Sequence, residues 1–153
     1  MSDIFNTEFE VSLRILLTLE SSGQRRLSAD MIAATDFITV YGREFGVSDK
    51  NLHGENNYKF GEFALRREVV KESLKSLVLD GFVYVDDREN GFTYYLSERG
   101  QTYAEKFNSE YSVNYRSYAQ KANEYLSKLS EREALKQINN HSIMSLKRGE
   151  VNG

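Results

Sequence analysis

The chain has 153 residues, of which 40% are apolar and 28% charged, a composition that predicts one globular domain with a single core. It contains no cysteine, which excludes disulfides, thiolate catalysis and cysteine-based zinc sites. Its formal charge is −3, with 23 acidic against 20 basic side chains, which disfavours a general attraction to phosphates. Apolar runs such as Ile15–Leu17 are far too short for a signal-peptide core or a membrane span, so we expect a cytoplasmic protein.

Two helices are predicted at the start of the chain, over residues 7–21 and 28–41, because apolar residues recur there at helical spacing. A long loop, residues 42–59, follows the second helix. Loops of this length are uncommon in compact domains and are often functional. Apolar residues such as Leu52, together with Asn and Asp side chains that can bond its backbone, favour an ordered loop over a flexible linker.

A third helix, a hairpin and a further helix are predicted next. The apolar spacing of the third helix stops at Gly81, which suits the left-handed position that ends many helices. The runs 82–85 and 92–96 are β-branched and aromatic, and Asn90-Gly91 favours a turn between them. Ser97 is predicted to cap the helix that follows.

This order of elements is that of a winged helix-turn-helix. We predict a mainly α fold of the α+β class, with a long loop between helices two and three and a long C-terminal helix. Residues 1–130 are expected to form the winged-helix domain with its C-terminal helix. Residues 131–153 are more polar and are expected to form a flexible tail.

The last predicted helix carries tyrosines at alternating spacings of four and three, as in the a and d positions of a coiled coil. We call these residues the tyrosine seam: Tyr111, Tyr115, Tyr118, Ala122, Tyr125 and Leu129. Tyrosine combines an apolar ring with a hydroxyl that tolerates water, which suits a surface that waits for a partner. The seam is therefore interpreted either as a partner or self-pairing surface or as the cover of its own domain.

The third helix also carries one basic stripe, formed by Arg67, Lys71 and Lys75, that could contact nucleic acid. Glutamates on the same helix nearly cancel its charge, and the predicted wing tip is acidic where a DNA reader usually carries Lys or Arg. The long loop also interrupts the short turn of a DNA-binding helix-turn-helix. We expect a solvated flank with paired charges, and keep protein or DNA contact as alternatives.

Two further elements carry a resemblance to a known family: Asn51-Leu52-His53-Gly54 in the loop and Arg66-Arg67-Glu68 in the third helix. With the stretch around them, FGVSDKNLHGENNYKFGEFALRREVVKESLKSLVLDGFV, they resemble the middle component of bacterial ABC-three-component systems, which include Lamassu-type antiviral defence. The resemblance covers residues 9–129 and does not extend to the tail.

The resemblance implies a small non-enzymatic adaptor or regulatory subunit. Such a subunit bridges an SMC-like or ABC-type ATPase and a toxic effector, commonly a nuclease, in an anti-phage or anti-plasmid complex. It implies protein–protein interaction as the main activity, with DNA contacted indirectly through the complex. The short apolar runs indicate that no membrane is involved. We expect the partner contacts to include Asn51 and His53 of the loop and the four tyrosines of the seam.

Two residues need separate interpretation. His53 has one histidine companion, His141 in the tail, whereas a zinc site needs three or four convergent ligands, so no metal is expected. Arg67 lies near the centre of the apolar stripe of the third helix and, if buried, must be paired. We interpret it either as a structural clasp that holds the loop or second helix through Asp36 or Asp49, or as a flank arginine with its head in water.

No catalytic constellation is visible. The sequence has no cysteine nucleophile and no phosphate-binding GxxxxGK[ST] or GxGxxG segment, and its two histidines offer little for a triad. We therefore expect no enzyme and no cofactor. The adaptor is the leading hypothesis, with a winged-helix DNA-binding transcription regulator and a self-associating structural protein as alternatives.

Overall fold

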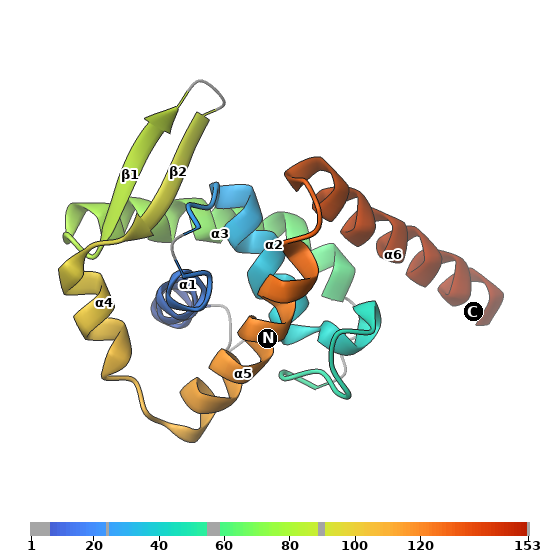
Figure 1. Cartoon of the computed structure of the whole chain (residues 1–153). Coiled ribbons are helices and arrows are strands. Elements are labelled where there is room, and N and C mark those ends of the chain that lie inside the picture. Colours follow the sequence, from blue (N-terminus) through green and yellow to red (C-terminus); the bar gives the residue numbers. More distant parts are fainter. Residues whose placement is uncertain (1–6, 24, 55–58, 89–90, 153) are drawn as a thin grey trace.

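The computed structural model describes residues 7–23, 25–54, 59–88 and 91–152. The protein is mainly helical with one antiparallel hairpin, which confirms the predicted α+β class. In Figure 1 the hairpin projects from the helices on one side and the last helix extends on another. The elements in chain order are α1 (Glu8–Ser21), α2 (Ala29–Val40), a 3-10 helix η1 (Gly42–Phe45), α3 (Lys59–Leu79), β1 (Val83–Arg88), β2 (Gly91–Leu96), α4 (Glu98–Glu105), α5 (Glu110–Leu126) and α6 (Glu131–Asn152).

Helices α1, α2, α4 and α5 each begin at a hydroxyl side chain that accepts a hydrogen bond from an amide of the first turn. These caps are Thr7, Ser28, Ser97 and Ser109. The predicted cap at Ser97 is therefore confirmed. Its hydroxyl also donates to the Gly81 carbonyl at 2.6 Å, which joins the start of α4 to the end of α3.

Helix α2 is the centre of the core. Every residue from Met31 to Val40 is buried, because α1, α3, α5 and α6 all pack against this helix. Its two buried threonines, Thr35 and Thr39, donate their hydroxyls to the carbonyls of Met31 and Thr35 one turn earlier. A helix buried on all sides shows little amphipathic pattern, and its polar groups must be satisfied from within.

The hairpin follows the predicted design. Strands β1 and β2 pair from Val83 with Leu96 to Arg88 with Gly91, and Gly81 and Gly91 both have positive φ. Residue 90 of the predicted turn lies outside the described residues. Leu27, between α1 and α2, adds a short bridge to Tyr94 of β2, with main-chain hydrogen bonds of 3.2 and 2.8 Å. The hairpin is thus fastened to the helices at its base.

The end of the chain corrects the prediction of a flexible tail from residue 131. Helix α6 covers this region as far as Asn152 and packs against α2 and α3, with Ala134 and Ile138 buried. Its start is a capping box: the Ser130 hydroxyl accepts from the Glu133 amide, and the Glu133 carboxylate accepts from the Ser130 amide. Residues 131–142 therefore contribute to the same core as the rest of the chain.

Candidate functional site

A cluster of buried polar side chains surrounds Asp36 of α2. Arg14 of α1 donates from Nε to this carboxylate at 2.9 Å, and Arg66 of α3 donates from Nη1 at 3.0 Å. From α5, the Tyr115 hydroxyl donates to the same carboxylate at 2.6 Å and lies 2.9 Å from the Thr18 hydroxyl. These five side chains come from four helices and are all 3% exposed or less. We call them the Asp36 cluster.

The charges of the Asp36 cluster balance largely within the protein. Burial opposes ionisation of Asp36, but the charges of Arg14 and Arg66, with the Tyr115 hydrogen bond, outweigh it and lower the pKa of this carboxyl to about 2. The second carboxylate near Arg66 is Glu62, one turn earlier on α3, at 3.6 Å. Breaking such a cluster by removing one partner leaves a buried charge uncompensated, so its first role is to fix four helices together.

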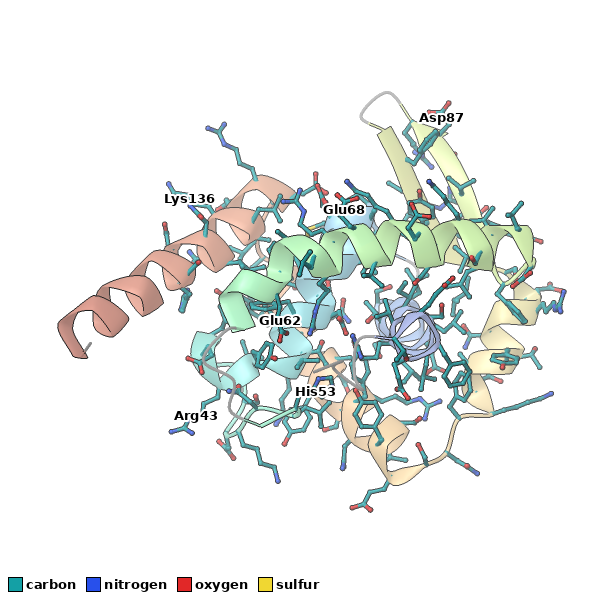
Figure 2. The ribbon with its side chains drawn as sticks, turned by 180° about the vertical axis from the view of Figure 1, so that it is seen from behind. Arg43, His53, Glu62, Glu68, Asp87 and Lys136 are labelled. Atoms are coloured by element: carbon teal, nitrogen blue, oxygen red, sulfur yellow. The ribbon has the colours of Figure 1, made fainter. Side chains whose placement is uncertain are left out.

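The loop after α2 lies next to this cluster, because His53 contacts Tyr111, whose ring centroid is 6.2 Å from that of Tyr115. The His53 Nε2 atom lies 2.5 Å from the Tyr111 hydroxyl, and the two rings stack with centroids 5.7 Å apart. Burial, reinforced by the positive charges of Arg14 and Arg66, lowers the pKa of His53 to about 3, so the ring is neutral at pH 7. In Figure 2, Glu62 on α3 and His53 lie on the same side of the molecule, whereas Arg43 points outward.

Asn51 closes the beginning of the same loop. Its side chain accepts from the Arg43 amide at 3.1 Å and donates to Glu44 at 3.3 Å. Asn51 is 7% exposed, so the prediction of a partner contact at this residue is wrong: its side chain orders the loop. The predicted long loop thus contains η1 and a hydrogen-bonded turn, while residues 55–58 lie outside the described residues.

The tyrosine seam is turned largely inward. Tyr115 has no exposed surface and is a member of the Asp36 cluster, so its prediction as a partner contact is wrong. Ala122 of the seam is also completely buried. Tyr111, Tyr118 and Tyr125 are half-buried, and a partner contact at these three residues stays a prediction. The seam covers its own domain because α5 packs against both α1 and α2.

Arg67 does not pair with either predicted carboxylate. Its guanidinium forms two hydrogen bonds with Asp30 at the start of α2, of 3.0 and 2.9 Å, and its side chain is 36% exposed. The buried arginine of α3 is its neighbour Arg66, which belongs to the family motif but was not predicted to be buried. The spacing alone does not separate the two arginines, because positions 66 and 67 both lie three or four residues from Phe63 and Val70. Packing of the helices places Arg66 on the buried face.

The basic stripe of α3 is paired along its length. Lys71 lies 3.7 Å from Glu68 and Lys75 lies 3.2 Å from Glu72, both one turn apart, and Arg67 is held by Asp30. The predicted pairing with glutamates is confirmed for Lys71 and Lys75, whereas contact of this stripe with protein or DNA stays a prediction. Figure 2 shows Glu68 on this helix and Asp87 near the end of the hairpin that projects from it.

Comparisons with known proteins identify the family. The family model described as ABC-three component (ABC-3C) system Middle Component 2 matches residues 4–148. The chain belongs to this family. No curated protein and no solved structure matches the chain. The middle-component assignment made from Asn51–Gly54 and Arg66–Glu68 is therefore confirmed.

In this middle component, the hairpin carries exposed apolar side chains. Val85, Tyr94 and Phe92 share one face, because Val85 pairs with Tyr94 and Phe92 lies two residues from Tyr94. Phe92 is 57% and Val85 44% exposed. Burial raises the pKa of Tyr94, and the charge of Lys75 on α3 opposes this rise. Strand β1 packs against α3, so the hairpin lies beside this helix. We call Val85, Phe92 and Tyr94 the hairpin face.

Over residues 7–23, 25–54, 59–88 and 91–152, no group of three acidic or histidine side chains could hold a metal ion. In the same part of the chain, no helix has the length and apolar character needed to cross a bilayer.

Proposed function

We propose that this middle component is a non-enzymatic adaptor of winged-helix architecture in a Lamassu-type defence complex. It would hold an SMC-like or ABC-type ATPase and an effector, a nuclease, in one assembly that acts against phages or plasmids. ATP turnover and cleavage would belong to the other components, and DNA would be reached through the complex. The family match supports a role among several components, since the family is named as one part of a three-component system.

The order of elements supports the winged-helix part of the proposal. Helices α1, α2 and α3 are followed directly by the hairpin β1–β2, and Leu27 pairs with β2 as the short first strand of a winged helix would. The departure from a DNA-binding helix-turn-helix is the insertion between α2 and α3, which holds η1 and the loop with Asn51 and His53. This insertion replaces the tight turn.

The observation that carries the adaptor function is the hairpin face beside a neutral α3 flank. In a DNA reader, α3 and the wing would present cations to phosphates. Here the cations Lys71 and Lys75 are paired with glutamates, and Phe92 and Val85 are left exposed. Exposed aromatic and aliphatic side chains next to paired charges are typical of a surface that binds protein.

The test is reconstitution with the other two components of the system. The chain is co-expressed with the ATPase and the effector, and the mass of the purified complex is measured at 0.1 and 0.5 M salt. We expect a complex of fixed ratio that survives the higher salt, because the contact is mainly apolar. Combining Val85→Asp with Phe92→Asp should release the chain, whereas Val113→Asp, at a 54% exposed residue of α5, should not.

A winged-helix transcription regulator is the second candidate, favoured by the same order of elements. It predicts salt-sensitive DNA binding by the isolated chain that is lost when Arg67, Lys71 and Lys75 are changed to alanine. We expect no such binding at 0.15 M salt. Tight DNA binding together with the absence of a protein complex would replace the adaptor by the regulator.

A further inference from the structure

A second exposed apolar surface lies away from the hairpin face, between three helices. It is a groove of about 400 Å³ formed by the start of α1, the end of α3 and α4. Leu13, Leu16 and Leu77 belong to its apolar lining, and Phe9, at its edge, is 69% exposed. A phenylalanine left so exposed on the first turn of a helix contributes nothing to the core, so its placement beside the groove calls for an explanation.

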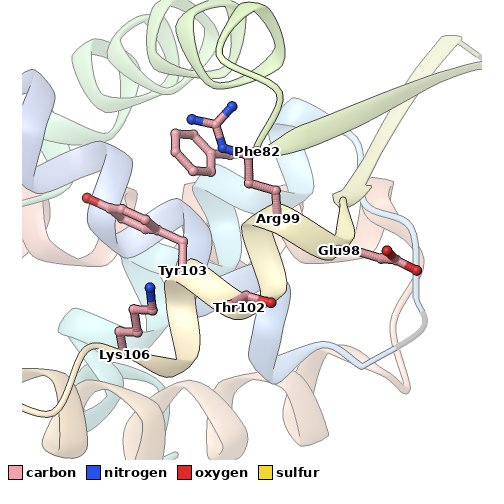
Figure 3. A pocket seen from close by; sticks show the side chains of 6 residues that line it. All are labelled: Phe82, Glu98, Arg99, Thr102, Tyr103 and Lys106. Atoms are coloured by element: carbon pink, nitrogen blue, oxygen red, sulfur yellow. The ribbon is translucent and has the colours of Figure 1, made fainter.

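One wall of the groove is a row of aromatic rings. The ring of Tyr103 lies 4.8 Å from Phe82 and 5.0 Å from Phe107, measured between centroids. Phe82 and Tyr103 also line an adjoining hollow on α4, so the two depressions form one continuous surface. Figure 3 shows Arg99, Tyr103 and Lys106 on the side of α4 that faces Phe82, while Glu98 points the other way. Arg99 stacks on Phe82 with 4.4 Å between guanidinium and ring centroid.

The rim of this surface carries charges of both signs. Glu8 and Asp80 belong to the residues around the groove between α1 and α3. Glu98, Arg99 and Lys106 belong to the hollow on α4, and Arg99 is already engaged there, because it donates to the main-chain carbonyl of Asp80 at 2.8 Å and stacks on Phe82. A ligand that covers both depressions would therefore meet acidic groups beside α1 and the cation of Lys106 on α4.

We propose that this groove binds an amphipathic helix from another component of the same system. The occupant places apolar residues at helical spacing against Leu13, Leu77 and the aromatic row. It carries Lys or Arg toward Glu8 and Asp80, and Asp or Glu toward Lys106. The identity of the partner rests on the proposed function, since an adaptor needs a contact to each of its two partners and the hairpin face supplies one.

A helix fits this surface better than an extended strand. The groove is bordered by helices, and the backbone of Phe82 within it is already used: its amide donates to Leu77 and its carbonyl accepts from Ser97. An extended segment would find no sheet edge there and would bury its own backbone groups unpaired. A helix satisfies those groups internally and offers only side chains.

The experiment places a photo-crosslinking amino acid at Ser12, which lines the groove, in the complex reconstituted with the ATPase and the effector. The matched control carries the same amino acid at Gln120, an exposed position on α5. We expect position 12 to crosslink one amphipathic segment of another component that carries basic residues toward Glu8 and Asp80. Crosslinking to a second copy of this chain, or no more crosslinking than from position 120, would overturn the proposal.

Affinity of the reconstituted complex provides the second readout. Phe9→Asp and, separately, Asp80→Lys should each weaken binding by about tenfold or more, the effect expected of an anchor and of a reversed rim charge. Val113→Asp serves as the control, and the unfolding temperature of each variant shows that the fold is retained. Unchanged affinity in both groove variants overturns the groove and leaves the adaptor function intact. Failure of the unmodified chain to bind either component overturns both.

Discussion

The Asp36 cluster and the groove beside Phe9 both depart from the usual rule that charged side chains are exposed and apolar ones are buried. In the Asp36 cluster, charged groups are buried and bonded to one another, so the four helices that carry them are fixed without any partner. Phe9 at the groove and Phe92 on the hairpin face are instead exposed to solvent, although both are large apolar side chains. The first region therefore serves the fold, and the second is available for another molecule.

The largest effect is expected from removing the charge at the centre of the first region. Asp36→Asn keeps the shape of the side chain but leaves Arg14 and Arg66 buried without their common counter-ion. We expect the free energy of unfolding to fall by about 3–5 kcal/mol. Denaturant unfolding monitored by circular dichroism measures this loss.

The control for this variant is Asp30→Asn, which disturbs the half-exposed pair with Arg67. Its effect should stay below about 1 kcal/mol. If both variants lose the same free energy of unfolding, the buried cluster stabilises the fold no more than an exposed ion pair does. The difference drawn between the two regions would then be wrong.

The next effect is expected at Gly100, where α4 meets the hairpin base. A Cβ atom at this position would lie 1.9 Å from the carbonyl oxygen of Phe82, which is backbone and cannot move aside alone. Gly100→Ala should therefore lower the free energy of unfolding by about 1–3 kcal/mol. It should also displace α4 and so weaken binding in the groove. Gly61→Ala is the matched control, because nothing lies within 4 Å of its Cβ position.

His53 predicts a pH dependence. Its folded pKa is about 3, below its ordinary value of 6.5, so protons bind the unfolded chain first as the pH falls. The neutral ring contributes fully to the free energy of unfolding above pH 6.5. As the pH falls from 6.5 toward 3, this contribution decreases by at most about 1.4 kcal/mol per pH unit. We expect His53→Gln to reduce the loss of stability between pH 7 and 5, a window above the titration of Asp36.

The control is Asn51→Ala in the same loop, which removes hydrogen bonds without removing a titrating group. It should lower stability by a similar amount at pH 7 and at pH 5. An unchanged pH profile in the His53 variant would mean that the ring is not held neutral by its buried position.

Local signals predicted the elements of this fold better than the positions of single side chains. The cap at Ser97 and the positive φ at Gly81 and Gly91 depend on a few neighbouring residues, so the sequence indicated them directly. The capping box Ser130–Glu133 is equally local, although the polar composition of residues 131–153 favoured a tail over a helix. These features need no knowledge of tertiary packing.

Side-chain partners depend on how the helices are rotated against one another. The apolar stripe of α3 passes between Phe63 and Val70 through position 66 or 67 with nearly equal spacing, and packing against α2 selects Arg66. Likewise, the tyrosine spacing on α5 does not say which tyrosine meets a buried carboxylate. Tyr115 donates its hydroxyl to Asp36, so a residue that was predicted to lie on the surface belongs to the core.

The smallest effects are expected on the α3 flank. Arg67→Ala should cost less than about 1 kcal/mol, because its pair with Asp30 is open to solvent on one side. Lys71→Ala and Lys75→Ala should each cost a few tenths of a kcal/mol, since their side chains are 47% and 70% exposed. A double-mutant cycle with Arg67→Ala and Asp30→Ala measures the coupling directly. A coupling energy above about 2 kcal/mol would mean that Arg67 holds α3 to α2 as firmly as Arg66 does. A smaller coupling energy would mean that the α3 flank contributes little to the stability that the Asp36 cluster provides.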